Sequence, residues 1–182
     1  MGNTQHFQAK HLHVQAFAAE AASLSGQEPL THYPRLAQES VQLQDDMAVY
    51  WNAQGRTVPV MGGAAEIWMD LEAHATVWMQ CQRCLEPSLQ ELHVQRSFRF
   101  VQNESAAEKL DDEIEEDVLV YGKDFDLYAL IEDELLMELP VAPRHGVCPQ
   151  MPVMQVQTAD YTEAEEEKPN PFAVLQGLKQ QK

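Results

Sequence analysis

A long alternation of apolar and polar residues constrains the fold of this chain more than any other feature. From Ile67 to Met79 every odd-numbered residue is apolar, and the residues between them are mostly polar. Over 92–100 apolar residues again recur at every second position, interrupted only by Arg96. A period of two is typical of a strand with one buried face. The two runs lie on either side of residues 80–88, so they predict a long antiparallel hairpin over 66–102.

Weaker patterns predict the rest of the sheet and its helices. Residues 47–61 alternate less regularly and contain Asn-Ala-Gln-Gly at 52–55, which indicates a second hairpin. Helices are predicted near 16–25, ending at Gly26, and over 127–139, capped by Asp126 and stopped by Pro140. The remaining predicted elements are a short helix over 31–39, a solvated acidic loop over 103–117 and a short strand over 118–121.

These elements predict an α+β fold, with a mostly antiparallel sheet built from hairpins and a few covering helices. We expect one domain over 1–148 and a flexible, disordered acidic linker over 149–169, where proline, glutamate and glutamine prevail. Residues 170–182 are expected to form a short amphipathic helix. Its predicted partner-binding residues are the N-cap, the first helical residue and one apolar stripe, namely Asn170, Pro171, Phe172, Leu175 and Leu178. So short a helix is unstable alone in water, so the stripe must dock on its own domain or on a partner.

The cysteines point to a structural site at the tip of the long hairpin. Cys81 and Cys84 form a C-x-x-C pair there, and His145 and Cys148 follow the last predicted helix with H-x-x-C spacing. Three thiols and an imidazole are a ligand set suited to tetrahedral zinc. The alternatives are two buried thiols that shape the turn, or a redox pair. Redox chemistry of the thioredoxin type needs its first cysteine at a helix N-terminus, which strand-like flanks disfavour. The glycine common after zinc-knuckle cysteines is missing, and Leu85 follows Cys84.

Four segments together resemble one known family. They are C-Q-R-C-L-E-P at 81–87, the helical run 126–140, H-G-V-C at 145–148 and N-P-F-A-V-L-Q-G-L-K at 170–179. Their order resembles that of the YceD family, best over 65–148 and 169–179. These are bacterial proteins associated with accumulation of large-subunit ribosomal RNA. The resemblance implies a role in ribosome biogenesis, and it supplies no agreed reaction.

The charge of the chain favours a protein partner over naked RNA. It carries 29 acidic and 12 basic residues, a net charge of −17 at pH 7. Affinity for phosphates comes from clustered lysine and arginine, which this composition lacks. Basic ribosomal proteins would be attracted instead. We therefore expect a ribosomal protein or a pre-ribosomal particle as partner, with indirect RNA contact. Arg83, between the two hairpin cysteines, is the basic residue most suited to touch that partner.

The sequence thus favours a non-enzymatic ribosome-biogenesis factor, involved in the synthesis, processing or stability of 23S ribosomal RNA. The alternative is an RNA-acting enzyme, or a zinc- or thiol-dependent redox protein using Cys81 and Cys84. No phosphate-binding glycine loop, H-E-x-x-H or G-x-S-x-G motif supports catalysis. Apolar runs are too short for a membrane span and no signal pattern opens the chain. We expect a cytoplasmic protein that makes no membrane contact, with structural zinc as the one candidate cofactor.

Overall fold

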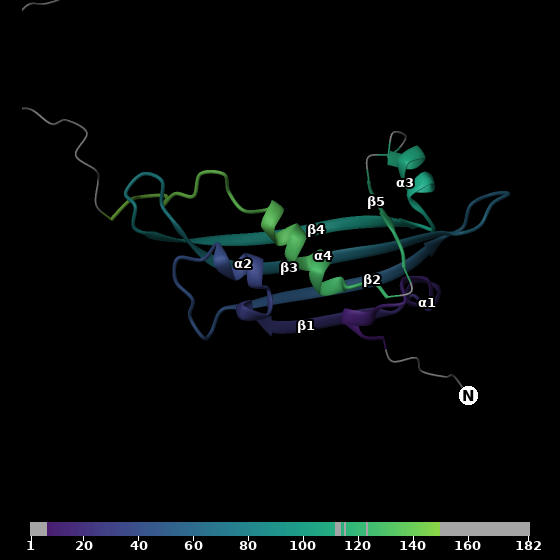
Figure 1. The fold of residues 1–182 in the computed structure, drawn as a ribbon, viewed down its shortest axis with the longest axis horizontal. Coiled ribbons are helices and arrows are strands. Elements are labelled where there is room, and N and C mark those ends of the chain that lie inside the picture. The colour runs from purple at the N-terminus through teal and green to yellow at the C-terminus, as the bar shows by residue number, and fades with distance from the viewer. Residues whose placement is uncertain (1–6, 112–113, 115, 123, 150–182) are drawn as a thin grey trace, which may run out of the picture. The chain divides into compact units, whose positions relative to one another are not determined.

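The computed structural model describes residues 7–111, 114, 116–122 and 124–149. Within them one sheet has the strand order β1-β2-β3-β4-β5 (Figure 1). Neighbouring strands are antiparallel except for β5, which is parallel to β4. The predicted α+β class is therefore confirmed. The strands are β1 Ser23–Pro29, β2 Ala48–Val58, β3 Glu66–Gln80, β4 Pro87–Val101 and β5 Asp117–Val120.

The helices are short, apart from the last. Figure 1 shows α4 and α2 over the same face of the sheet. The side chains of Leu127, Ile131 and Leu135 give α4 a fully buried stripe on that face. No helix in the described part of the chain is long and apolar enough to cross a bilayer. The helices are η1 Ala9–His11, α1 Val14–Ala19, η2 Leu30–His32, α2 Pro34–Gln38, α3 Glu104–Asp111 and α4 Leu127–Met137.

The long hairpin of β3 and β4 is confirmed. Its register runs from Ile67 opposite Phe100 to Gln80 opposite Pro87. The odd-numbered residues of β3 and the even-numbered residues of β4 share the face that α4 covers. Arg96 lies on this face and pairs with two carboxylates, Asp117 at 3.3 Å and the buried Glu134 at 3.4 Å. A charge on the inner face is tolerated because it is paired.

The hairpin predicted over 47–61 is wrong. Residues 48–58 form one continuous strand, β2, which pairs with β1 on one side and β3 on the other. Gly55 does not turn the chain but lets α1 lie directly on β2. A Cβ at Gly55 would come within 2.7 Å of the backbone oxygen of Phe17. The lack of a side chain at Gly55 therefore lets the backbone of α1 approach β2 closely.

The helix predicted near 16–25 is also shorter than expected, since α1 ends at Ala19 and β1 begins at Ser23. Gly26 therefore lies within β1, where the indole of Trp51 and the carboxylate of Glu28 occupy the space that a Cβ would need. Residues 103–117 are likewise not all loop, because α3 forms there with Asn103 accepting a bond from Ala106 N. The predicted helix over 127–139, the strand near 118–121 and the Asp126 cap are confirmed.

A buried carboxylate joins α4 to α2. Oε1 of Glu132 accepts hydrogen bonds from the backbone N–H groups of Arg35 at 2.7 Å and Leu36 at 3.2 Å. Its Oε2 accepts from Arg35 Nε at 2.9 Å. The first N–H groups of a helix have no partner within the helix, so Glu132 supplies one to α2 from outside. This contact fixes α2 beside α4.

We expect the change Gly26→Ala to lower the free energy of unfolding by about 1–3 kcal/mol. The added methyl group would lie 2.7 Å from both the Trp51 ring and Glu28 Oε1, so these groups would have to move. Urea denaturation measures the loss. Gly63→Ala is the matched control, because the nearest atom to a Cβ there is 3.7 Å away. Equal stability of both variants would contradict the close packing at Gly26.

Candidate metal centre

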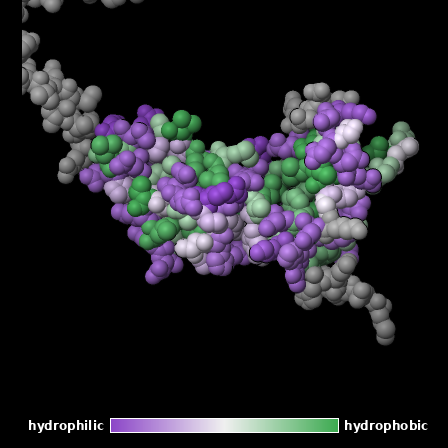
Figure 2. Space-filling model, in the orientation of Figure 1, coloured by the Kyte–Doolittle hydropathy of each residue, from purple (hydrophilic) through white to green (hydrophobic). Residues whose placement is uncertain are grey.

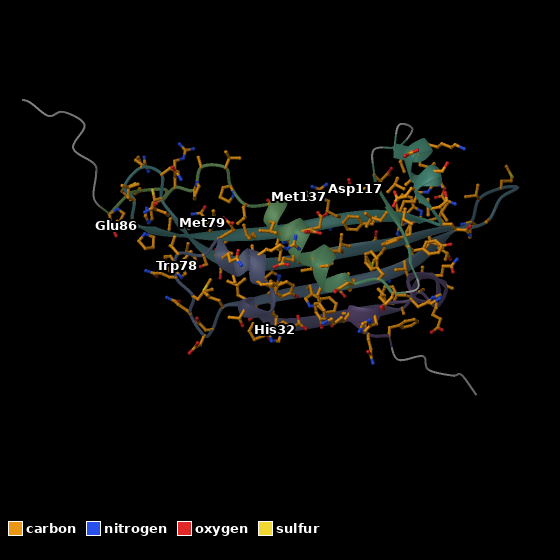
Figure 3. The ribbon with its side chains drawn as sticks, in the orientation of Figure 1. His32, Trp78, Met79, Glu86, Asp117 and Met137 are labelled. Atoms are coloured by element: carbon orange, nitrogen blue, oxygen red, sulfur yellow. The ribbon has the colours of Figure 1, made fainter. Side chains whose placement is uncertain are left out.

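The turn between β3 and β4 is closed by two backbone hydrogen bonds. Cys81 N donates to Glu86 O, and Leu85 N donates to Cys81 O, each at 2.9 Å. Trp78, Met79 and Glu86, labelled in Figure 3, mark this end of the hairpin. Gln82 N donates to Pro143 O at 2.9 Å, which fastens the segment after α4 to the turn. That bond brings 145–148 beside the C-x-x-C pair.

The four predicted ligands lie together. The ligand atoms of Cys81, Cys84, His145 and Cys148 are all within 4.8 Å of one another. The sulfurs of Cys81 and Cys148 are 3.8 Å apart, and Cys84 Sγ lies 3.3 Å from His145 Nδ1. Zinc–sulfur bonds of about 2.3 Å in a tetrahedron place two sulfurs about 3.8 Å apart. The donor set and its spacing fit zinc.

The imidazole of His145 is oriented for metal binding. Its Nε2 lies 2.9 Å from Pro87 O, and a carbonyl oxygen can only accept a hydrogen bond. Nε2 therefore carries the ring proton in the neutral form, and Nδ1 presents its lone pair to Cys84 Sγ. A carbonyl that holds the second nitrogen of a ligand histidine is a common outer-shell arrangement in zinc sites.

The surroundings favour a thiolate at Cys81. Burial alone would raise the pKa of this thiol, but backbone N–H groups of Cys84, His145 and Arg83 donate to its sulfur and lower the pKa to about 5. The pKa of Cys84 is raised by burial and by the neighbouring Cys148 and Cys81 sulfurs, which disfavour another negative charge. A bound cation would remove that repulsion, because it neutralises the clustered thiolates.

Arg83 is exposed, as predicted, but its guanidinium already has partners. Nε donates to Cys148 Sγ at 3.0 Å, and an Nη donates to the carbonyl of His145 at 2.9 Å. Arg83 thus places a positive charge beside the sulfur cluster and helps to hold 145–148. Sequence reasoning missed this role, and it missed the Pro87 carbonyl, because a backbone oxygen carries no sequence signal. The predicted partner-binding residues Asn170, Pro171, Phe172, Leu175 and Leu178 lie outside the described residues.

Leu85 occupies the position after the second hairpin cysteine, where zinc knuckles commonly have glycine. Its φ is +65°, in the left-handed region that glycine adopts most easily. The residue is 65% exposed, so its side chain makes little packing contact in return. Exposed apolar residues gather at this end of the domain (Figure 2), including Leu85, Leu89 and Val147. The backbone at position 85 therefore adopts a positive φ although a branched side chain disfavours that conformation.

Comparison with known proteins agrees with the motif order. Residues 69–179 match a family described as "Large ribosomal RNA subunit accumulation protein YceD". The chain belongs to the YceD family. A relative in Haemophilus influenzae with that same description is 34% identical over 153 residues, which cover 80% of this chain and 81% of that protein. No solved structure matches the chain. The YceD match spans both the cysteine cluster and residues 170–179.

We expect the reduced protein, purified without chelators, to carry about one equivalent of zinc. Cys84→Ser should release most of it and lower the melting temperature, because metal-binding energy contributes to folding. Elemental analysis measures the metal, and cobalt substitution reports thiolate ligation through its charge-transfer absorption. His93→Gln, on the exposed face of β4, is the control and should keep its zinc. If the wild-type protein neither contains nor takes up metal, the zinc site is wrong and the cysteines only shape the turn.

We also expect Leu85→Gly to raise the free energy of unfolding by about 1 kcal/mol, because glycine removes the strain of a positive φ. Leu85→Ala keeps the strain and removes the same exposed side chain, so it separates backbone from side-chain effects. Denaturant titration of both variants at saturating zinc makes the comparison. A glycine variant no more stable than the alanine variant would mean that Leu85 carries no strain.

Proposed function

We propose that this protein is a non-enzymatic ribosome-biogenesis factor of the cytoplasm. It promotes the accumulation of 23S ribosomal RNA by binding a ribosomal protein or an assembly intermediate. Membership of the YceD family, through a match over residues 69–179, is the observation that carries the proposal. The description of the Haemophilus influenzae relative supports the same process.

The charges of the described residues support a protein partner with indirect RNA contact. Four of the six arginines are paired with carboxylates of the protein itself. An arginine with a carboxylate partner has little charge left for RNA, and a surface of surplus acids repels phosphates. The same surface attracts a basic ribosomal protein. The pairs are Arg35 with Glu132 and Asp133, Arg56 with Asp70, Arg96 with Asp117 and Glu134, and Arg99 with Glu66.

The cysteine cluster supports a structural role for zinc. The metal would hold the hairpin end and the 145–148 segment together. The exposed edge of the Arg83 guanidinium would contact the partner. The alternative function, a thiol redox protein, is favoured by the lowered pKa of Cys81. Its sulfur belongs to a fully buried residue, however, and a thiol that attacks a substrate must be reachable. The structural proposal therefore accounts for more of the geometry.

We expect deletion of the gene to lower mature 23S ribosomal RNA relative to 16S, or to leave 23S precursors unprocessed. Sucrose-gradient profiles and RNA electrophoresis measure this, with a cold-stressed culture as the more demanding condition. Wild-type protein should restore the ratio, and Cys84→Ser should restore it less. His93→Gln is the control for complementation. Unchanged ratios and profiles in the deletion strain would overturn the assignment.

The apolar stripe expected near the C-terminus, Phe172, Leu175 and Leu178, should bind a partner and not the domain. Truncation after Lys168 should leave the melting temperature nearly unchanged, yet weaken capture of ribosomal proteins and rescue of 23S accumulation. Phe172→Ala with Leu175→Ala should do the same without altering charge, because it removes apolar surface that a partner would bury. Calorimetry and complementation are the measurements. A marked fall in melting temperature would assign the segment to the domain core instead.

A further inference from the structure

A cavity of about 630 Å³ lies between β1, η2, α2 and α4, apart from the cysteine cluster. Its lining combines aromatic rings with carboxylates. His32, labelled in Figure 3, marks the rim where η2 leaves β1. The lining residues that matter here are Lys10, Glu28, Tyr33, Asp126, Tyr128 and Glu132.

Glu28 is the chemical centre of this cavity. It is half-buried and points inward from β1, where it accepts hydrogen bonds from three aromatic side chains. Trp51 Nε1 donates at 2.5 Å, Tyr128 Oη at 3.2 Å and Tyr33 Oη at 3.4 Å. Burial, and then the charge of Glu28, raise the pKa of both tyrosines. The three donors are therefore neutral, and they hold the carboxylate in place without cancelling its charge.

The carboxylates of the cavity differ in how they are compensated. Glu132 is paired with Arg35 at 2.9 Å. Among the described residues, no lysine, arginine or histidine nitrogen lies within salt-bridge distance of Glu28 or Asp126. Lys10 is the cation on the lining that partly offsets them. The cavity therefore presents fixed negative charge, in a partly dehydrated site where a charged group interacts more strongly than in water.

We propose that this cavity receives an arginine or lysine side chain from a basic protein segment. Glu28, which has no cationic partner among the described residues, supplies the charge-assisted hydrogen bond that such a cation needs. The partly exposed ring of Tyr128 supplies an aromatic wall, which attracts a cation through the ring quadrupole and shelters the aliphatic stem. Tyr33 is fully buried and contributes through its hydroxyl group, which helps to hold Glu28. This inference rests on the proposed function, and it assigns to the basic partner a specific place on the domain.

The Trp51 indole N–H is the reporter for this site, because it donates to Glu28 directly. We would titrate the full-length, isotope-labelled protein with a peptide that carries one arginine between glycines, and follow the indole resonances by NMR. Trp51→Phe assigns the signal. The matched control peptide carries citrulline, which keeps the shape of arginine and removes the charge. An RNA oligonucleotide and free arginine form two further arms.

We expect the arginine peptide to shift the Trp51 indole signal saturably at physiological salt, and the citrulline peptide to leave it unchanged. Glu28→Gln should weaken binding about tenfold, because it removes the charge that the guanidinium meets. Lys10→Met should strengthen binding roughly two- to fivefold, because it removes a competing cation. Glu91→Gln, an identical charge change on the opposite face of the sheet, should have no effect.

If Glu28→Gln does not fold, Asp126→Asn replaces it, since asparagine keeps the helix cap while removing a cavity charge. This variant should also weaken binding. The inference would be overturned by equal shifts with both peptides, by no shift with either, or by a shift with RNA alone. Unchanged affinity in the Lys10→Met variant would also overturn it. Free arginine binding as tightly as the peptide would overturn the protein-segment source. The titration is independent of 23S levels in the deletion strain, so the inference and the proposed function can fail separately.

Discussion

The register between β3 and β4 holds the rest of the domain in place. A slip of one residue would turn every inward side chain of one strand to solvent. The pairing of Ile67 with Phe100 and of Gln80 with Pro87 therefore sets both ends of the hairpin at once. One end receives β5 beside β4, and the other leaves a six-residue turn in which two thiols face the same point. The inner face between these ends is what α4 covers.

Carboxylates do much of the internal tethering in this acidic protein. Glu132 gives the first turn of α2 an acceptor, Glu134 meets Arg96, and Glu28 gathers three aromatic donors. Each is an acceptor placed where neutral or cationic donors would otherwise lack a partner, which makes partial burial of the acid tolerable. The result is a domain whose arginines are largely engaged from within. Its outward electrostatic character is set by the acids that remain.

The structure was predicted most accurately from the sequence where a pattern depends on one strand or one helix alone. The alternation of 67–79 and the Asp126 cap were predicted correctly because each follows from local geometry. Gly26 and Gly55 misled the prediction, since glycine signals a turn and a close approach equally well, and only the positions of Trp51 and Phe17 distinguish them. The ligand residues could be named from spacing. Their convergence could not be, because it depends on the bond from Gln82 to Pro143 across the fold.

The backbone at Leu85 has a consequence for how candidate metal centres of this kind are recognised. Metal-binding turns are usually sought by the glycine that follows the second cysteine, because that residue relieves the left-handed backbone. Here residue 85 has a left-handed φ although it is an exposed leucine with a branched side chain. A search keyed to glycine would therefore pass over this chain. The dihedral angle defines the turn, and the residue type only sets how much free energy the turn costs to form.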